Sequence, residues 1–70
     1  MLPLSFANVN EEVTVQLVKG NPETKKHLED LGFVTGGKVK VISKNGDNII
    51  VNVKETRLGL DKSMANKIMI

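Results

Sequence analysis

Apolar and polar residues alternate on both sides of Asn45-Gly46, and this alternation restricts the fold more than any other feature of the chain. Positions 39, 41, 49, 51 and 53 all hold Val or Ile. A period of two is the period of a β-strand, and Asn-Gly favours a tight hairpin turn. The sequence therefore predicts a β-hairpin whose strands cover residues 38 to 44 and 48 to 54.

The register of this hairpin follows from keeping the odd-numbered apolar side chains on one face. A two-residue turn at Asn45-Gly46 would divide them between the two faces. A three-residue loop over 44 to 46, closed by a left-handed Gly, instead pairs Val41 with Ile49 and keeps the set together. We expect this loop, which gives the outer face the following side chains: Lys38, Lys40, Ile42, Lys44, Asn48, Ile50, Asn52 and Lys54.

Two segments nearer the N-terminus have shorter apolar patterns. Residues 13 to 17 alternate with period two, which predicts a half-buried strand with Val13, Val15 and Leu17 directed inward. The segment from Leu2 to Phe6 is apolar but contains a Pro, which has no backbone N–H to donate within a central strand. We expect this segment to form an edge or a lid over the core.

One helix is delimited at both ends by local signals. Asn21, Pro22 and Glu23 have the order of an N-cap, a first helical residue and a first-turn acid. Gly32 stands where a left-handed residue ends a helix. A helix over residues 22 to 31 is therefore predicted, and the side chains that share its inward face are Thr24, Leu28 and Leu31.

The last third of the chain predicts one strand, a helical turn and a final strand. Leu58 and Leu60 alternate, Asp61 is placed to cap a short turn over 61 to 66, and residues 68 to 70 are apolar. A chain of 70 residues buries enough surface for one core only. We therefore expect a single, mainly β domain over residues 1 to 70, with about five short strands and one inserted helix.

Composition excludes several classes of function. Ten Lys and Arg against eight Asp and Glu leave a net charge of +2, and two Phe are the only aromatics, so nucleic acid is a minor candidate partner. The absence of Cys excludes disulfides, thiolate nucleophiles and cysteine zinc sites. The longest aliphatic run, Ile49-Ile50-Val51, is far shorter than the roughly 20 residues of a membrane span, and the N-terminus lacks a signal-peptide pattern. We expect a cytoplasmic protein.

The catalytic inventory does not indicate an enzyme. Ser5, Ser43 and Ser63 stand in no recognisable nucleophile motif, and a single His cannot by itself establish a triad. The chain has no G-x-x-x-x-G-K-[ST] loop for a nucleotide. A pocket of about 300 Å³ is also hard to combine with a filled core in so short a chain. We expect a non-catalytic protein without a cofactor.

A longer pattern connects the helix end to the hairpin. Residues 28 to 36 read L-x-x-L-G, an apolar residue and a further Gly, and run into Val39 and Val41. Shorter patterns at the two ends of the chain accompany it: Leu4-Ser5, Leu58-x-Leu60 and Ala65-x-x-Ile68-x-Ile70. In order and spacing these residues resemble the FeoA family, small SH3-like β-barrels associated with the ferrous-iron transporter FeoB. The resemblance covers essentially the whole chain, although Asn10 and Asp61 stand where the family often has Gly and a basic residue.

The resemblance implies a fold, a partner and a function. It implies an SH3-like barrel that docks on the cytoplasmic side of a FeoB-type membrane GTPase and modulates Fe(II) uptake. The candidate partner-binding residues lie on the outer hairpin face: Lys40, Ile42, Lys44 and Ile50. Ile42 and Ile50 form there either an apolar spot surrounded by lysines or a patch that the terminal strands cover. The exposed flank of the helix is a second candidate contact.

Other hypotheses rest on separate residues. Glu23, His27 and Asp30, spaced i, i+4 and i+7, are either weak ligands for a divalent metal such as iron or a solvated helix flank. Arg57 is either an arginine finger for a partner GTPase or an ordinary surface residue. The alternative functions are an SH3-like module that binds RNA or DNA and a weak iron-binding or iron-sensing protein that uses the His27 trio. Weak self-association through an exposed edge strand stays open.

Overall fold

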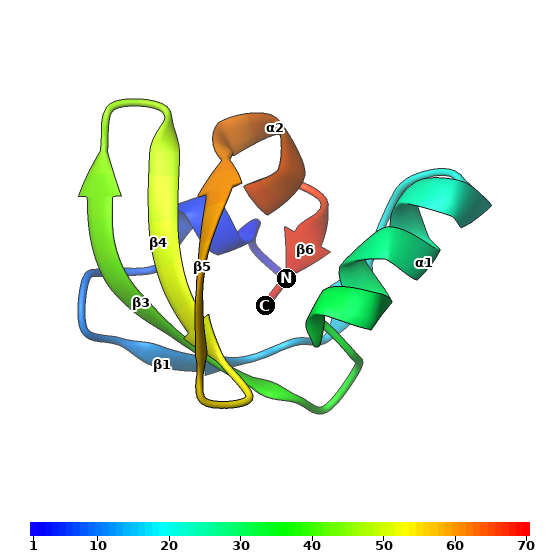
Figure 1. Cartoon of the computed structure of the whole chain (residues 1–70), viewed down its shortest axis with the longest axis horizontal. Coiled ribbons are helices and arrows are strands. Elements are labelled where there is room, and N and C mark those ends of the chain that lie inside the picture. The colour runs from blue at the N-terminus through cyan, green and yellow to red at the C-terminus, as the bar shows by residue number, and fades with distance from the viewer.

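A computed structural model describes all residues from Met1 to Ile70 and shows two small antiparallel sheets with one long helix beside them (Figure 1). The elements follow one another along the chain in this order: η1 (Leu4–Phe6, a 3₁₀ turn), β1 (Glu12–Thr14), β2 (Leu17–Val18), α1 (Pro22–Leu31), β3 (Lys38–Asn45), β4 (Asn48–Val53), β5 (Thr56–Asp61), α2 (Lys62–Ala65) and β6 (Ile68–Met69). The predicted mainly β class with one inserted helix is confirmed.

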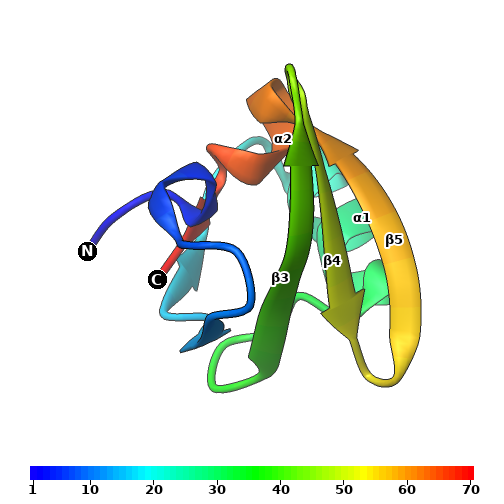
Figure 2. The ribbon, with the colours of Figure 1, turned by 90° about the vertical axis from the view of Figure 1, so that its left-hand side faces the viewer.

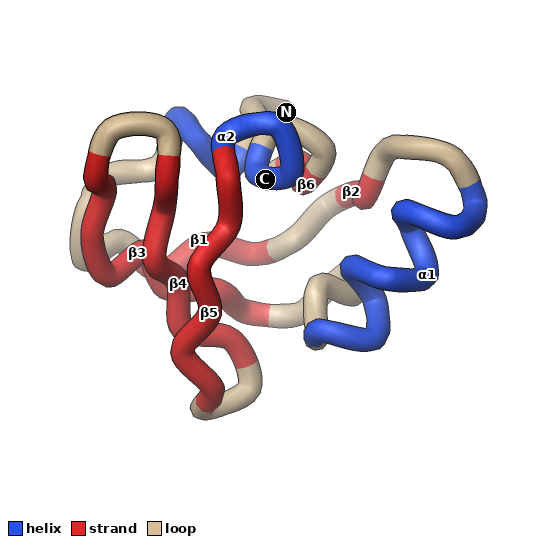
Figure 3. The backbone as a smooth tube through the Cα atoms, turned by 45° about the horizontal axis from the view of Figure 1, so that its top comes forward, coloured by secondary structure: helices blue, strands red, loops and turns tan.

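The larger sheet has the order β1-β3-β4-β5, and the smaller sheet pairs β2 with β6. The last strand therefore closes against β2 and not against the hairpin. The N-terminal segment joins the smaller sheet, because Leu2 and Ile70 exchange backbone hydrogen bonds of 3.0 and 2.7 Å. The two chain ends consequently lie side by side (Figures 1 and 2), while α1 lies to one side of the larger sheet (Figure 3).

The strand expected over residues 13 to 17 is divided, which corrects one predicted orientation. Between β1 and β2 the backbone of Val15 bonds instead to Gly36 and Gly37, with N···O distances of 2.8 and 2.9 Å. The chain then changes sheets and the alternation shifts by one residue. Val18, paired with Ile68, is buried, whereas Leu17 is 39% exposed and not directed inward as predicted.

The hairpin keeps its predicted apolar face but not its predicted register. The turn is the two-residue Gly46-Asp47, with Asn45 opposite Asn48, and a bulge falls between Val41 and Ser43. Val41 therefore lies opposite Val51 and not opposite Ile49 as predicted. A bulge inserts one extra residue into the strand. It therefore keeps the odd-numbered side chains of both strands on one face, as the extra residue of a three-residue loop would. The five odd-numbered residues are all buried: Val39, Val41, Ile49, Val51 and Val53.

Both helices have the caps that the sequence predicts. The side chain of Asn21 accepts a hydrogen bond of 2.8 Å from the backbone N–H of Thr24, and Gly32 ends α1 with φ of 114°. The carboxylate of Asp61 accepts one of 2.8 Å from the N–H of Met64 at the start of α2. The inward face of α1 buries Leu28 completely, in one cluster with Phe33 and the odd-numbered hairpin residues. No helix is long and apolar enough to cross a membrane.

Candidate functional site

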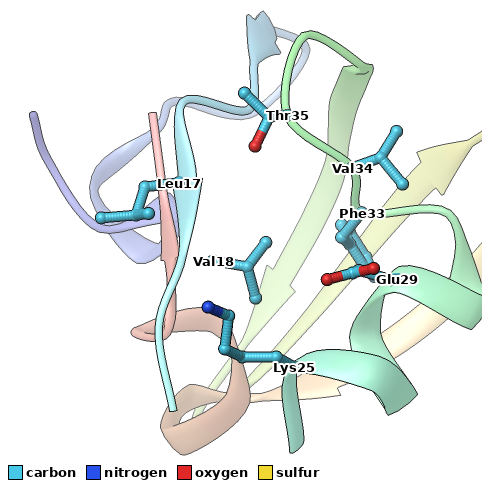
Figure 4. A pocket seen from close by; sticks show the side chains of 7 residues that line it. All are labelled: Leu17, Val18, Lys25, Glu29, Phe33, Val34 and Thr35. Atoms are coloured by element: carbon cyan, nitrogen blue, oxygen red, sulfur yellow. The ribbon is translucent and has the colours of Figure 1, made fainter. Parts of the chain in front are cut away.

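A pocket of about 230 Å³ lies between β2, α1 and the segment that follows α1 (Figure 4). Sequence reasoning did not expect a pocket in so small a protein. Seven residues line the pocket, four of them apolar and the others a lysine, a glutamate and a threonine: Leu17, Val18, Phe33, Val34, Lys25, Glu29 and Thr35. The pocket is therefore an apolar depression with charged and polar groups around it.

Three local features shape this pocket. Gly32 ends α1, and the next N–H, that of Phe33, bonds back to the carbonyl of Leu28 at 3.0 Å, so the Phe33 ring is completely buried beneath the pocket. The shift of alternation at β2 directs Val18 toward the pocket, with Leu17 on the far side of the strand (Figure 4). Lys25 and Glu29 lie one turn apart on α1, so both side chains reach the same flank.

The predicted metal trio does not converge. Glu23, His27 and Asp30 are all exposed on α1, and the structure contains no group of three or more His, Cys, Asp or Glu side chains that could hold a metal ion. Positions i and i+7 of a helix are about 10 Å apart along its axis, too far for both carboxylates to reach one ion.

The predicted outer-face residues are brought together only in part. Lys40 and Ile50 lie on the outer face of the larger sheet, and Ile42 is the extra residue of the bulge. Lys44 lies opposite the buried Ile49, so its side chain is on the other face, where the ammonium donates a hydrogen bond of 3.0 Å to the carbonyl of Ser5. The bulge between Val41 and Ser43 causes this change of face for Lys44, because the extra residue moves every later residue of β3 to the face opposite the one that strict alternation predicts.

The terminal strands do not lie over this outer face. They pair with each other and with β2, so they do not cover Ile50, which is half-buried. Ile50 instead lies beside Gly59 of β5, with its Cδ1 3.5 Å from the position of a Cβ at residue 59. Lys40, Asn52 and Arg57 form one row across the sheet, because Lys40 lies opposite Asn52 and Asn52 lies opposite Arg57. Arg57 is exposed on β5.

Aromatic side chains are absent from this basic face. Phe33 is completely buried in the core, and Phe6, 65% exposed, belongs to η1. Nonspecific binding of single-stranded nucleic acid combines a positive groove with aromatic rings on which bases stack. The outer face offers Lys38, Lys40 and Arg57 without such rings.

Comparison with known proteins supplies the family. Residues 2–70 match the model of the FeoA domain. The chain belongs to the FeoA domain family. It is 31% identical over 70 residues to a protein of Methanocaldococcus jannaschii named "Putative Fe(2+) transport protein A", covering all of this chain and 85% of that relative.

Solved structures agree with this FeoA assignment. The crystal structure of Stenotrophomonas maltophilia FeoA complexed with zinc, described as a prokaryotic SH3 domain protein, superposes with a TM-score of 0.87 at 28% identity, covering 99% of this chain and 88% of that one. The solution structure of the Chlorobium tepidum FeoA protein gives 0.87 at 30% identity, covering 97% and 67%. The predicted SH3-like fold and the resemblance to FeoA are both confirmed.

Proposed function

We propose that this FeoA-family protein is a non-catalytic cytoplasmic accessory protein that binds a FeoB-type transporter and modulates its uptake of Fe(II). The relative from Methanocaldococcus jannaschii is named for Fe(2+) transport, and the Stenotrophomonas protein is described as possibly a ferrous iron transport activating factor. Both descriptions support a role beside a transporter.

The pocket beside α1 is the observation that carries this proposal. Its floor is apolar, with Phe33 and Val18 almost fully removed from solvent, and Lys25 and Glu29 stand beside it. Such a depression fits one apolar side chain of a partner, with the two charges selecting polar groups around that side chain. Modulation then requires that the protein bind one state of the transporter more tightly than another, because equal binding shifts no equilibrium.

The outer sheet face is the second surface that supports docking. Ile42 and Ile50 are half-buried there, and Lys40 gives the face positive charge for an acidic partner. The two surfaces are on different elements, so single substitutions separate them. Lys44, turned to the other face, contributes to neither.

Binding to purified FeoB in detergent, measured by biolayer interferometry, tests the proposal. Thr35 is exposed at the pocket, so Thr35→Trp fills the pocket without disturbing the core and is expected to weaken binding about tenfold or more. Thr56→Trp places the same side chain at another exposed threonine and is expected to leave binding unchanged. Loss of binding in Ile50→Asp with normal binding by Thr35→Trp would assign docking to the outer face. No binding by the unmodified protein would overturn the proposed function.

A further inference from the structure

β5 is the unpaired edge of the larger sheet. It pairs with β4 on one side over its whole length, and no strand pairs with its other side. Figure 2 shows β5 at the margin of the molecule with no ribbon beyond it. Arg57 and Gly59 are both exposed in this strand. A further strand therefore has access to the edge.

The turn between β4 and β5 determines which backbone groups face outward. Lys54 and Glu55, with φ of 50° and 63°, form a two-residue turn, so Val53 and Thr56 are its closing hydrogen-bonded pair. Hydrogen-bonded and non-bonded pairs alternate along an antiparallel ladder. The N–H and C=O groups of residues 57 and 59 and the N–H of residue 61 therefore point away from β4, while the C=O of Asp61, as the N-cap of α2, accepts the first hydrogen bond of that helix. None of the backbone bonds outside the regular elements involves Arg57 or Gly59.

Two common protections of a sheet edge, a Pro and a bulge, are missing from β5, and its two charged residues, Arg57 and Asp61, are of opposite sign. Edge strands are commonly blunted by Pro, by a bulge or by a covering loop. β5 contains no Pro, and its register with β4 is continuous from Thr56 to Asp61. The edge thus offers outward donors and acceptors at Arg57 and Gly59 and an outward donor at Asp61.

The charges of β5 are arranged to match an antiparallel copy of itself. A two-fold axis through Gly59 places Arg57 directly opposite the partner's Asp61, and repeats the same pair at the other end. Both side chains lie on the outer face, and Asp61 caps α2 through only one carboxylate oxygen, Oδ1. Opposite charges directly across a strand pair stabilise the pairing. We propose that the protein self-associates as a dimer through antiparallel pairing of β5 with β5, centred on Gly59.

The same geometry buries apolar groups on both faces of the joined sheet. Ile50 lies opposite Gly59, and its side chain occupies the space beside the glycine, which has no side chain of its own. In the dimer the two Ile50 side chains therefore flank the pair of glycines at its centre. On the inner face Leu58, half-buried in the single chain, lies opposite the partner's Leu60. The half-buried side chains of Ile50 and Leu58 thereby lose further solvent-exposed area at the interface. The inference is independent of the proposed binding to FeoB.

Sedimentation equilibrium of the full chain over a range of concentrations tests this dimer. The unmodified protein is expected to rise from 7.7 kDa toward twice that mass. Gly59→Pro removes an outward N–H and no β4–β5 bond, and Arg57→Asp sets two acidic pairs across the interface. Each is expected to raise the dissociation constant about tenfold or more. Lys40→Asp makes the same charge change on β3, an interior strand of the same face, and is expected to dimerise normally.

Amide hydrogen exchange provides a second readout that does not depend on mass. The amides of Arg57 and Gly59 are expected to become protected as concentration rises, while that of Thr56, bonded to Val53, is protected throughout. A monomer at all concentrations, or a dimer that persists unchanged in both Gly59→Pro and Arg57→Asp, would overturn the proposal. Protection of Arg57 and Gly59 only on addition of FeoB would also overturn it, because a strand of the transporter would then occupy the edge.

Discussion

At the scale of single residues, Gly32 is a position where both the backbone angle and the available space disfavour a side chain. Its φ of 114° lies in the region that L-residues avoid, and a Cβ there would lie 3.1 Å from Cγ2 of Val53. Gly32 ends α1 and sends the chain directly into the buried Phe33. One glycine thus determines both the length of the helix and the floor of the pocket.

Gly32→Ala is expected to lower the free energy of unfolding by about 2 to 4 kcal/mol, combining left-handed strain with crowding against Val53. Gly36→Ala is the matched control, because Gly36 also has a positive φ, of 87°, but nothing lies within 4 Å of its would-be Cβ. Strain alone predicts a loss of about 1 to 2 kcal/mol there. Urea unfolding monitored by circular dichroism measures both values. Equal losses would contradict the packing contribution at Gly32.

At the scale of elements, the β4–β5 turn is built from residues that disfavour it. Lys54 and Glu55 both adopt positive φ, which the two-residue turn requires and which Asn and Gly supply at least cost. The register is held by the flanking pairs, such as Val51 opposite Leu58 on the apolar inner face. Tertiary burial therefore overrides the local preference of the turn.

Replacing Lys54-Glu55 by Asn-Gly is expected to raise the free energy of unfolding by about 1 to 2 kcal/mol, because both residues then adopt their turn conformation with less strain. Thermal and urea unfolding measure the change. Glu55→Gln removes the charge but keeps the conformational preference, and is expected to change stability by less than about 0.5 kcal/mol. A gain of the same size in Glu55→Gln would attribute the effect to charge and not to the backbone.

Some elements are determined by neighbouring residues in the sequence, and others by contacts with distant parts of the chain. The bounds of α1 follow from Asn21 and Gly32, which act through their nearest neighbours, so the sequence predicts them correctly. The bulge beside Val41 depends on which residues of β4 lie opposite, and the division of the first strand depends on β6. Both are contacts with distant parts of the chain, which a period of two in one segment does not specify.

The candidate site was less predictable for the same reason. The pocket exists because Val18 of β2 and Phe33 after α1 approach each other, and the sequence signal for each is only an apolar residue next to a turn. The two consecutive apolar residues Leu17-Val18 were the available sign that the alternation shifts there. Whether the outer-face residues Lys40, Ile42 and Ile50 bind a partner stays a prediction.

At the scale of the whole molecule, the two chain ends complete the fold together. Ile68 of β6 is completely buried and lies opposite Val18, and Leu4 from the N-terminal 3₁₀ turn is completely buried in the same cluster. The backbone bonds between Leu2 and Ile70 join the ends directly. The smaller sheet therefore depends on residues separated by almost the full length of the chain, and the pocket depends on that sheet through Val18.

Ile68→Ala is expected to lower the free energy of unfolding by about 2 to 5 kcal/mol, because it leaves a cavity where the smaller sheet meets the core. A domain of this size has a total stability of only about 4 to 10 kcal/mol, so the variant is expected to be partly unfolded at moderate temperature. Leu2→Ala is the matched control, since the Leu2 side chain is 53% exposed and its backbone bonds to Ile70 remain. Urea unfolding is expected to show a change below about 1 kcal/mol for that variant. Similar losses in the two variants would contradict the attribution of the effect to the burial of Ile68.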